Sequence, residues 1–257
     1  MLFAFAVCAV RGDTLNFSNT NYLAINDSDN PPTIATPYPS AITVSGLTGE
    51  VITNLTVTLN GFTHSFPSDV NIILVGPQGQ AVLLMSNVGG QDADSVSDLS
   101  ITLDDQAGAD LPLLDPLYSG TFRPTASATP LAFDFPPPAP AGNSNALPML
   151  SVFDGTDPDG VWSLFVVDDV AGDDGYISNG WSISVSVGVP LKIVGSTTNV
   201  VLSWPVVSGH SFVVQYAPSF TSGTWTNLSS VPAEISGSYV LTNAKAGPSG
   251  VFRLLVQ

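Results

Sequence analysis

Two aspartate-rich segments contain the side chains whose type and spacing best suit chemistry. The stretch "DGTDPDG" carries three aspartates, and "DDVAGDDGYISNGW", from Asp168 to Trp181, adds four aspartates and three glycines. Calcium prefers carboxylate oxygens, and closely spaced acids repel one another unless a cation relieves them. We therefore expect five carboxylates around one end of the domain, with at least three sharing one calcium ion. The five are Asp154, Asp157, Asp159, Asp168 and Asp173. The alternative is a solvated acidic turn whose aspartates accept hydrogen bonds from backbone N–H groups.

The chain has few residues from which a complete catalytic site could be built. It holds two histidines, His64 and His210, and one cysteine, Cys8. A Ser-His-Asp triad needs a histidine in reach of a nucleophile, and a zinc site needs more His or Cys ligands than are available. We therefore predict no catalytic residues in this chain. An aspartate pair of the glycosidase type is the remaining alternative.

Alternating apolar and polar residues predict short β-strands throughout the first two thirds of the chain. Such period-two stretches, bounded by Gly, Pro, Asn or Asp, indicate strands with one buried face. The clearest stretches are Ala41–Gly46, Val51–Gly61, Val70–Gly76, Ala81–Ser86, Leu99–Leu103, Val161–Asp168 and Trp181–Val187. They favour an all-β fold, a jelly-roll-like antiparallel β-sandwich. We expect Val161–Val167 and Gly180–Val187 to form a hairpin, with Trp162 and Trp181 in the core.

Composition divides the chain into an acidic unit and a smaller second unit. Residues 1–187 hold 20 of the 21 acids and two bases, a net charge of -18, whereas residues 188–257 carry one acid and three bases, a net charge of +2. We predict one domain over residues 15–187 and a small β-sandwich over residues 190–257. Residues 126–148 are rich in proline, which indicates a long surface loop between strands.

The net charge and the hydropathy of the chain limit which partners it could bind and in which compartment it could reside. A net charge of -16 with five Lys plus Arg cannot supply the basic patches that nucleic-acid binding requires. No apolar run reaches the length of a membrane span. Residues 1–12 form an apolar start that resembles an export signal or its remnant, with an apolar first strand as the alternative. We therefore expect a secreted or extracellular protein.

From His64 onward, several ordered motifs resemble the P domain (Homo B domain) of subtilisin-like proprotein convertases. A His-aromatic-x-x-Asp stretch precedes a strand that ends in Gly-Pro-x-Gly, and "TLDDQA" and "YSGTFRP" follow. The close is a Gly-x-Trp-x-Leu strand, an Asp, a Gly-Asp-x-Gly turn and a Trp. The matching residues are His64, Phe66, Asp69, Gly76, Pro77, Gly79, Gly160, Trp162, Leu164, Asp168, Gly172, Asp173, Gly175 and Trp181. The chain departs from the pattern at Val70, where Leu is common, and in the proline-rich insertion after Pro124. The second unit resembles small β-sandwich modules that end secreted bacterial proteins on Phe-Arg-Leu.

The resemblance implies a role beside a protease. P domains are non-catalytic modules that dock onto a subtilisin-like serine endopeptidase domain, stabilise it and adjust its response to calcium. The expected partner is therefore such a protease domain, in trans or in a longer chain. A different class of function, an extracellular adhesion or carbohydrate-binding sandwich, would require an exposed aromatic platform. The four tryptophans, Trp162, Trp181, Trp204 and Trp225, lie in strand-like patterns, so we expect most of them in the core.

Overall fold

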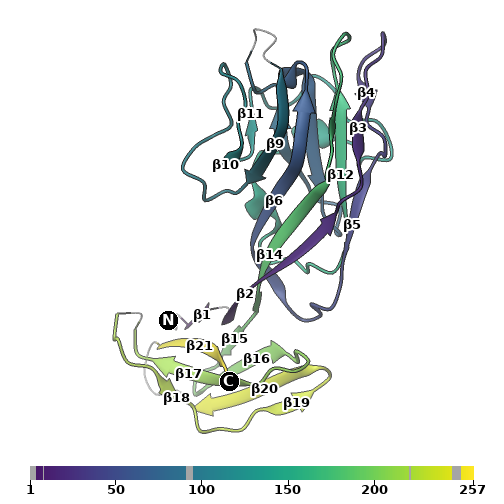
Figure 1. The fold of residues 1–257 in the computed structure, drawn as a ribbon. Coiled ribbons are helices and arrows are strands. Elements are labelled where there is room, and N and C mark those ends of the chain that lie inside the picture. Colours follow the sequence, from purple (N-terminus) through teal and green to yellow (C-terminus); the bar gives the residue numbers. More distant parts are fainter. Residues whose placement is uncertain (1–3, 8, 91–94, 220, 245–249) are drawn as a thin grey trace.

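The computed structural model describes residues 4–7, 9–90, 95–219, 221–244 and 250–257, with side chains from residue 14 onward. These residues form β-strands and three short 3-10 turns, so the predicted all-β sandwich is confirmed. Four sheets are present, two in each of two sandwiches (Figure 1). The larger sandwich contains the acidic part of the chain, and the smaller one contains about its last quarter.

The first sheet of the larger sandwich is built around the long strand β6. Its strands are β10 (Gly120–Phe122), β9 (Val96–Leu103), β6 (Val51–His64), β13 (Gly175–Ile177) and β3 (Leu23–Ile25), in that spatial order, together with β14 (Trp181–Val189) and β2 (Ala9–Asn19). Strand β14 lies between β6 and β2, and every pairing except β9 with β10 is antiparallel. Apolar residues alternate along β14, so one face of this sheet is directed into the core.

The second sheet faces the first across the core. Its strands are β11 (Thr125–Ala126), β8 (Ala81–Ser86), β7 (Val70–Val75), β12 (Gly160–Asp168), β4 (Thr33–Ile34) and β5 (Ser40–Val44), with both β4 and β5 paired to β12. Strands β7 and β8 form a hairpin whose turn is closed by the bond from Gly76 N–H to Gln80 O, at 2.9 Å. Trp162 and Trp181 come from opposite sheets and are both fully buried, as predicted.

The predicted hairpin of Val161–Val167 with Gly180–Val187 is wrong. Strand β12 belongs to the second sheet and β14 to the first, and the segment between them passes to the first sheet, where it forms β13. Both strands present alternate apolar residues to the same core, one from each side. The Asp- and Gly-rich stretch is therefore a sheet-to-sheet connection at one end of the sandwich.

The proline-rich segment is more buried than the predicted surface loop. It packs on the outer face of the second sheet, where Leu131, Phe135 and Ala139 join Ile73 and Phe165 in a separate buried cluster. This segment includes the short turn η2 (Asn143–Asn145). The turns η1 (Pro67–Asp69) and η3 (Leu150–Phe153) precede β7 and β12. The second sheet is thus covered on both faces.

The smaller sandwich has its own core around Trp204. One sheet contains β1 (Ala4–Val7), β21 (Gly250–Val256), β17 (Phe212–Ala217) and β18 (Thr226–Asn227), and the other contains β15 (Lys192–Gly195), β16 (Asn199–Pro205), β20 (Ser238–Ala244) and β19 (Ala233–Ile235). The buried cluster of the larger sandwich ends at Val187, and that of the smaller begins at Val189. Residues 4–7 and 9–19, which include most of the predicted export signal, take part in strand pairing.

Candidate functional site

The five aspartates predicted to bind calcium lie at opposite ends of β12. Asp154, Asp157 and Asp159 precede the strand, whereas Asp168 closes it and Asp173 follows. At about 3.3 Å per residue, the nine steps along the chain from Asp159 to Asp168 span about 30 Å. The expectation that all five surround one end of the sandwich is therefore wrong, because the length of β12 separates the three aspartates before it from Asp168 and Asp173.

Two of the three aspartates before β12 accept hydrogen bonds from backbone N–H groups, Asp157 locally and Asp159 from a segment distant in sequence. The Asp159 carboxylate accepts the N–H of Leu47 at 3.0 and 3.1 Å and the hydroxyl of Thr48 at 3.2 Å. Asp157 Oδ1 accepts the N–H of Asp159 at 3.0 Å. Burial, and then the charge of a neighbouring aspartate, raises the pKa of Asp154. For Asp157 and Asp159 these contacts match the capping alternative.

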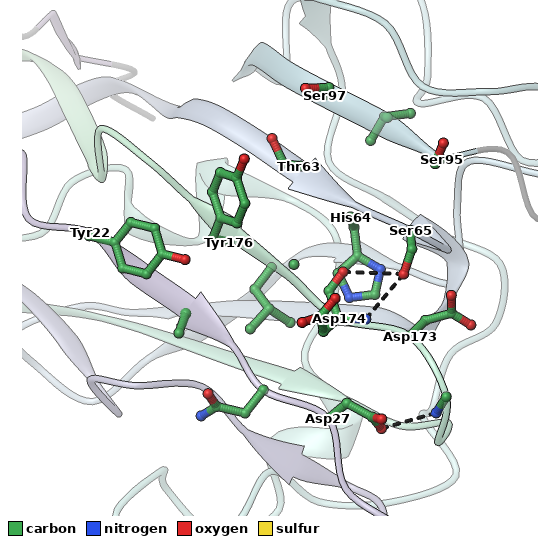
Figure 2. A pocket seen from close by; sticks show the side chains of 16 residues that line it. Tyr22, Asp27, Thr63, His64, Ser65, Ser95, Ser97, Asp173, Asp174 and Tyr176 are labelled. Carbon is green, nitrogen blue, oxygen red and sulfur yellow. Dashed lines mark hydrogen bonds between the residues drawn. The ribbon is translucent and has the colours of Figure 1, made fainter.

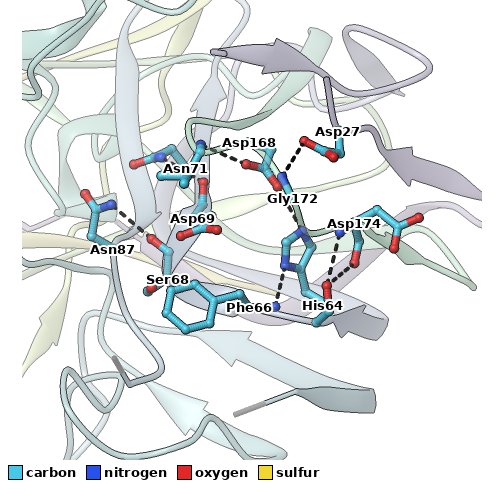
Figure 3. A network of polar contacts seen from close by, with 12 residues as sticks. Asp27, His64, Phe66, Ser68, Asp69, Asn71, Asn87, Asp168, Gly172 and Asp174 are labelled. Carbon is cyan, nitrogen blue, oxygen red and sulfur yellow. Dashed lines mark hydrogen bonds and ion pairs between the residues drawn. The ribbon is translucent and has the colours of Figure 1, made fainter. Parts of the chain in front are cut away.

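At the far end of β12, Asp168 pairs with His64 of the facing sheet. Asp168 Oδ2 lies 3.1 Å from His64 Nε2, an ion-pair distance without hydrogen-bond geometry, and both side chains are completely buried (Figure 3). The ring nitrogen Nδ1 accepts the N–H of Phe66 at 3.1 Å, and Asp168 Oδ1 accepts that of Val170 at 3.0 Å. Since Nδ1 is an acceptor, we assign the ring proton to Nε2, where it faces Asp168.

This pairing leaves His64 without a nitrogen that could activate a nucleophile. Its neighbour Ser65 is the nearest candidate by position, but the Ser65 hydroxyl accepts the N–H of Asp174 at 3.1 Å and donates to the Asp174 carbonyl at 3.3 Å. A general base needs a free lone pair in reach of the proton that it abstracts. The His64–Asp168 pair is therefore a structural contact between sheets.

Two further carboxylates lie beside this pair, on the outer face of the second sheet. Asp69 is 4% exposed and its Oδ2 has no hydrogen-bond partner among the described residues, and the same holds for Asp169 Oδ1. The two residues are neighbours, because the Asp169 N–H donates to the Asp69 carbonyl at 2.9 Å. Burial, followed by the charges of Asp168, Asp169 and Asp173, raises the pKa of Asp69 to about 7, and His64 opposes this shift.

Asp69 and Asp169 are members of the acidic cluster that the sequence reasoning missed. The signal available was their position next to strands: Asp69 lies just before β7 and Asp169 just after β12. Because β7 and β12 pair antiparallel, these two positions become neighbours. Within the described ranges, no three His, Cys, Asp or Glu side chains are arranged as a metal-binding group. Calcium binding stays a prediction.

A cavity of about 750 Å³ lies beside this acidic end, over the outer face of the first sheet (Figure 2). Its floor crosses four adjacent strands, β9, β6, β13 and β3. Tyr22 and Tyr176 stack at its edge, with ring centroids 5.4 Å apart and planes inclined by 29°. Trp162, Trp181 and Trp204 are buried, so the expectation that most tryptophans lie in the core is confirmed, and exposed aromatic surface comes from tyrosine instead.

No family model, curated protein or solved structure matches this chain. In the described part of the chain, no helix has the length and apolar character needed to cross a membrane.

Proposed function

We propose that the chain is a secreted, non-catalytic accessory module of the P-domain type, which docks beside a subtilisin-like serine endopeptidase and stabilises it. The observation that carries the proposal is the pairing of His64 with Asp168. These residues belong to the first and last motifs of the P-domain resemblance, and they meet in one buried contact between the two sheets. Motif residues with this placement support a shared architecture and a structural role.

The chemistry of the site favours an accessory role over a hydrolytic one. His64 uses both ring nitrogens in contacts with Phe66 and Asp168, and Ser65 is bonded to the backbone of Asp174. A serine nucleophile needs an adjacent base to take its proton. We therefore expect no labelling of the chain by a fluorophosphonate probe, and Ser65→Ala should behave as the parent does. Labelling at Ser65 would overturn the non-catalytic assignment.

Stabilisation of a protease is the direct test of the accessory role. Each subtilisin-like protease encoded near this chain should be incubated at a fixed temperature with an equimolar amount of the chain, and its residual activity followed. We expect a longer inactivation half-life, because a partner that binds only the folded protease shifts its unfolding equilibrium. An unrelated β-sandwich protein of similar net charge serves as the control. Unchanged half-lives for all such proteases would contradict the proposal.

Export can be tested on the chain recovered from the medium of the producing cells. Removal of residues 1–12 as a signal would shorten β2, which begins at Ala9 and pairs with β14. We expect the mature chain to start after Gly12, with pairing from Thr14 onward retained. Recovery of the chain only from the cell interior would contradict secretion.

A further inference from the structure

The cavity on the first sheet is built from the outward-facing residues of neighbouring strands. Along β13 and β3, Ile177 and Leu23 are directed into the core, so Tyr176 and Ala24 face outward. Tyr176 is paired with Thr63 of β6, whose hydroxyl in turn accepts the N–H of Asp98 in β9 at 2.9 Å. A ligand in this cavity would lie across the strands, on a surface held by ladder hydrogen bonds.

The edge of the cavity offers an aromatic surface. Tyr22 is 54% exposed although it is a large ring, and it stacks on Tyr176. The stacking holds the two rings in a fixed orientation, which lowers the entropy lost when a ligand packs against them. A flat aromatic face suits the C–H face of a sugar ring, which is apolar on one side and carries hydroxyls at its rim.

The rest of the lining consists of small polar side chains. Hydroxyls come from Ser95 and Ser97, whereas those of Thr63 and Ser65 are engaged with the Asp98 N–H and the Asp174 backbone. The Asn26 amide also belongs to the lining and donates to Ile34 O and Thr36 Oγ1. Side-chain hydroxyls both donate and accept hydrogen bonds, which suits a ligand with many hydroxyl groups.

Among the described residues, three carboxylates line the cavity, those of Asp27, Asp173 and Asp174, and they set the charge of the ligand. The described lining contains no lysine or arginine. Carboxylates accept hydrogen bonds from sugar hydroxyls but repel uronic acids, sialic acids and phosphate. Asp27 is partly engaged, since its Oδ1 accepts the N–H of Gly172 at 3.1 Å (Figure 3).

We propose that this cavity binds a neutral oligosaccharide, which packs against Tyr22 and Tyr176 and donates hydroxyl hydrogen bonds to Asp173 and Asp174. Its volume of about 750 Å³ accommodates a segment of a few sugar residues. The proposal does not rest on the accessory role: His64 belongs to the lining, but its side chain is completely buried, and the tyrosines and aspartates assigned to the ligand do not pair the sheets.

The test is calorimetric titration of the full chain with neutral hexasaccharides of glucose, xylose and mannose in the presence of a chelator. We expect saturable binding of at least one of them, and Tyr22→Ala and Tyr176→Ala should each weaken it about tenfold or more, a loss of about 1.4 kcal/mol. Tyr118→Ala is the matched control, because Tyr118 is 56% exposed but lies outside the cavity lining. Circular dichroism verifies that each variant is folded.

Two further titrations complete the test. A galacturonate hexasaccharide should not bind the parent chain and should bind Asp174→Asn weakly at most. The same substitution should reduce the affinity for the neutral hexasaccharide. A basic peptide such as tetralysine addresses the other ligand that three carboxylates could attract. Failure of all neutral hexasaccharides, or tetralysine binding that is lost in Tyr22→Ala, would overturn the glycan assignment. Either result would leave the accessory role to the protease experiment.

Discussion

His64 Nε2 of β6 lies 3.1 Å from Asp168 Oδ2 of β12, and this contact joins the two facing sheets where neither side chain reaches water. A buried carboxylate is tolerated only when nearby groups compensate for lost hydration. Asp168 has two such groups, the ring of His64 and the N–H of Val170. The pair therefore couples the order of the first sheet to that of the second.

Replacing His64 should cost more stability than its contacts alone suggest. His64→Phe removes the ring nitrogen that lies 3.1 Å from the buried Asp168 carboxylate, and breaking a buried pair in this way costs about 3–5 kcal/mol. Adding Asp168→Asn replaces the buried charge with a neutral amide, so the double variant should lose less than His64→Phe alone. Urea unfolding measures both, with His210→Phe as the control in the smaller sandwich. Equal losses at His64 and His210 would contradict the coupling of the sheets.

Calcium should stabilise the end of β12 where carboxylates accumulate. Asp168, Asp169 and Asp173 lie close enough to Asp69 that their charges raise its pKa. A cation that binds only the folded chain would add about 2.7 kcal/mol at a hundredfold excess over Kd. Melting should therefore rise with calcium and fall with chelator, and the shift should shrink in Asp173→Asn. Asp157→Asn, at the opposite end of the strand, should retain it. Identical melting curves with calcium and chelator would contradict the prediction.

The metal-free chain should lose stability as the pH rises through the range in which Asp69 titrates. The pKa of Asp69 is raised from 3.8 to about 7, mainly by burial. Between these values the folded chain binds more protons than the unfolded chain, so the free energy of unfolding falls with rising pH. Burial raises the pKa of Asp169 as well, which acts in the same direction.

Urea unfolding in chelator at pH 5 and pH 8 measures this dependence. Asp69→Asn should flatten it, whereas Asp115→Asn, which removes an exposed carboxylate, should leave it in place. A stability that increases from pH 5 to pH 8 in the parent and in Asp69→Asn alike would show that other groups dominate.

Asn143 should hold the proline-rich cover on the second sheet. Its side chain is 3% exposed, accepts the N–H of Phe135 at 2.7 Å, and donates to the carbonyls of Phe135 at 3.2 Å and Pro140 at 2.6 Å. Asn143→Ala leaves buried backbone groups unpaired, at about 1–3 kcal/mol for each. We expect faster proteolysis within residues 126–148. Asn145→Ala, at an exposed asparagine two residues along, is the control. Equal cleavage of both variants would show that Asn143 does not hold this segment on the sheet.

The strands were predictable from sequence because their signal is local. Alternation along Val51–Gly61 and Trp181–Val187 depends only on which face of a strand is buried, and β6 and β14 include both stretches. Sheet membership was not predictable in the same way. Strands β12 and β14 have the same pattern of alternation whether they pair with each other or face each other across a core. The hairpin prediction failed at this point.

The candidate site depends on contacts that sequence spacing does not encode. Asp168 was predicted as a calcium ligand from its acidic neighbours, but its partner is His64, which lies far away in the chain. Asp69 and Asp169 become neighbours only through the register of β7 with β12. Tyr22 and Tyr176 similarly meet through the pairing of β3 with β13. The residue types therefore indicated which chemistry is available, whereas the fold was needed to know which side chains lie together.

Gly175 in the connection from β12 to β14 should be intolerant of any side chain. A Cβ at this position would lie 2.2 Å from the Thr63 carbonyl and 2.4 Å from His64 Cδ2, so the backbone of β13 would have to move away from β6. Overpacking of this kind costs about 1–3 kcal/mol. The same movement would displace the ring of His64 from Asp168 and Tyr176 from Tyr22. Gly175→Ala should therefore lower the melting temperature and weaken the binding of any ligand in the tyrosine cavity. Gly108→Ala is the matched control, because a Cβ at that position has no heavy atom within 4 Å. If Gly175→Ala melts with the parent, β13 does not press against His64, and the connection is looser than this arrangement of strands requires.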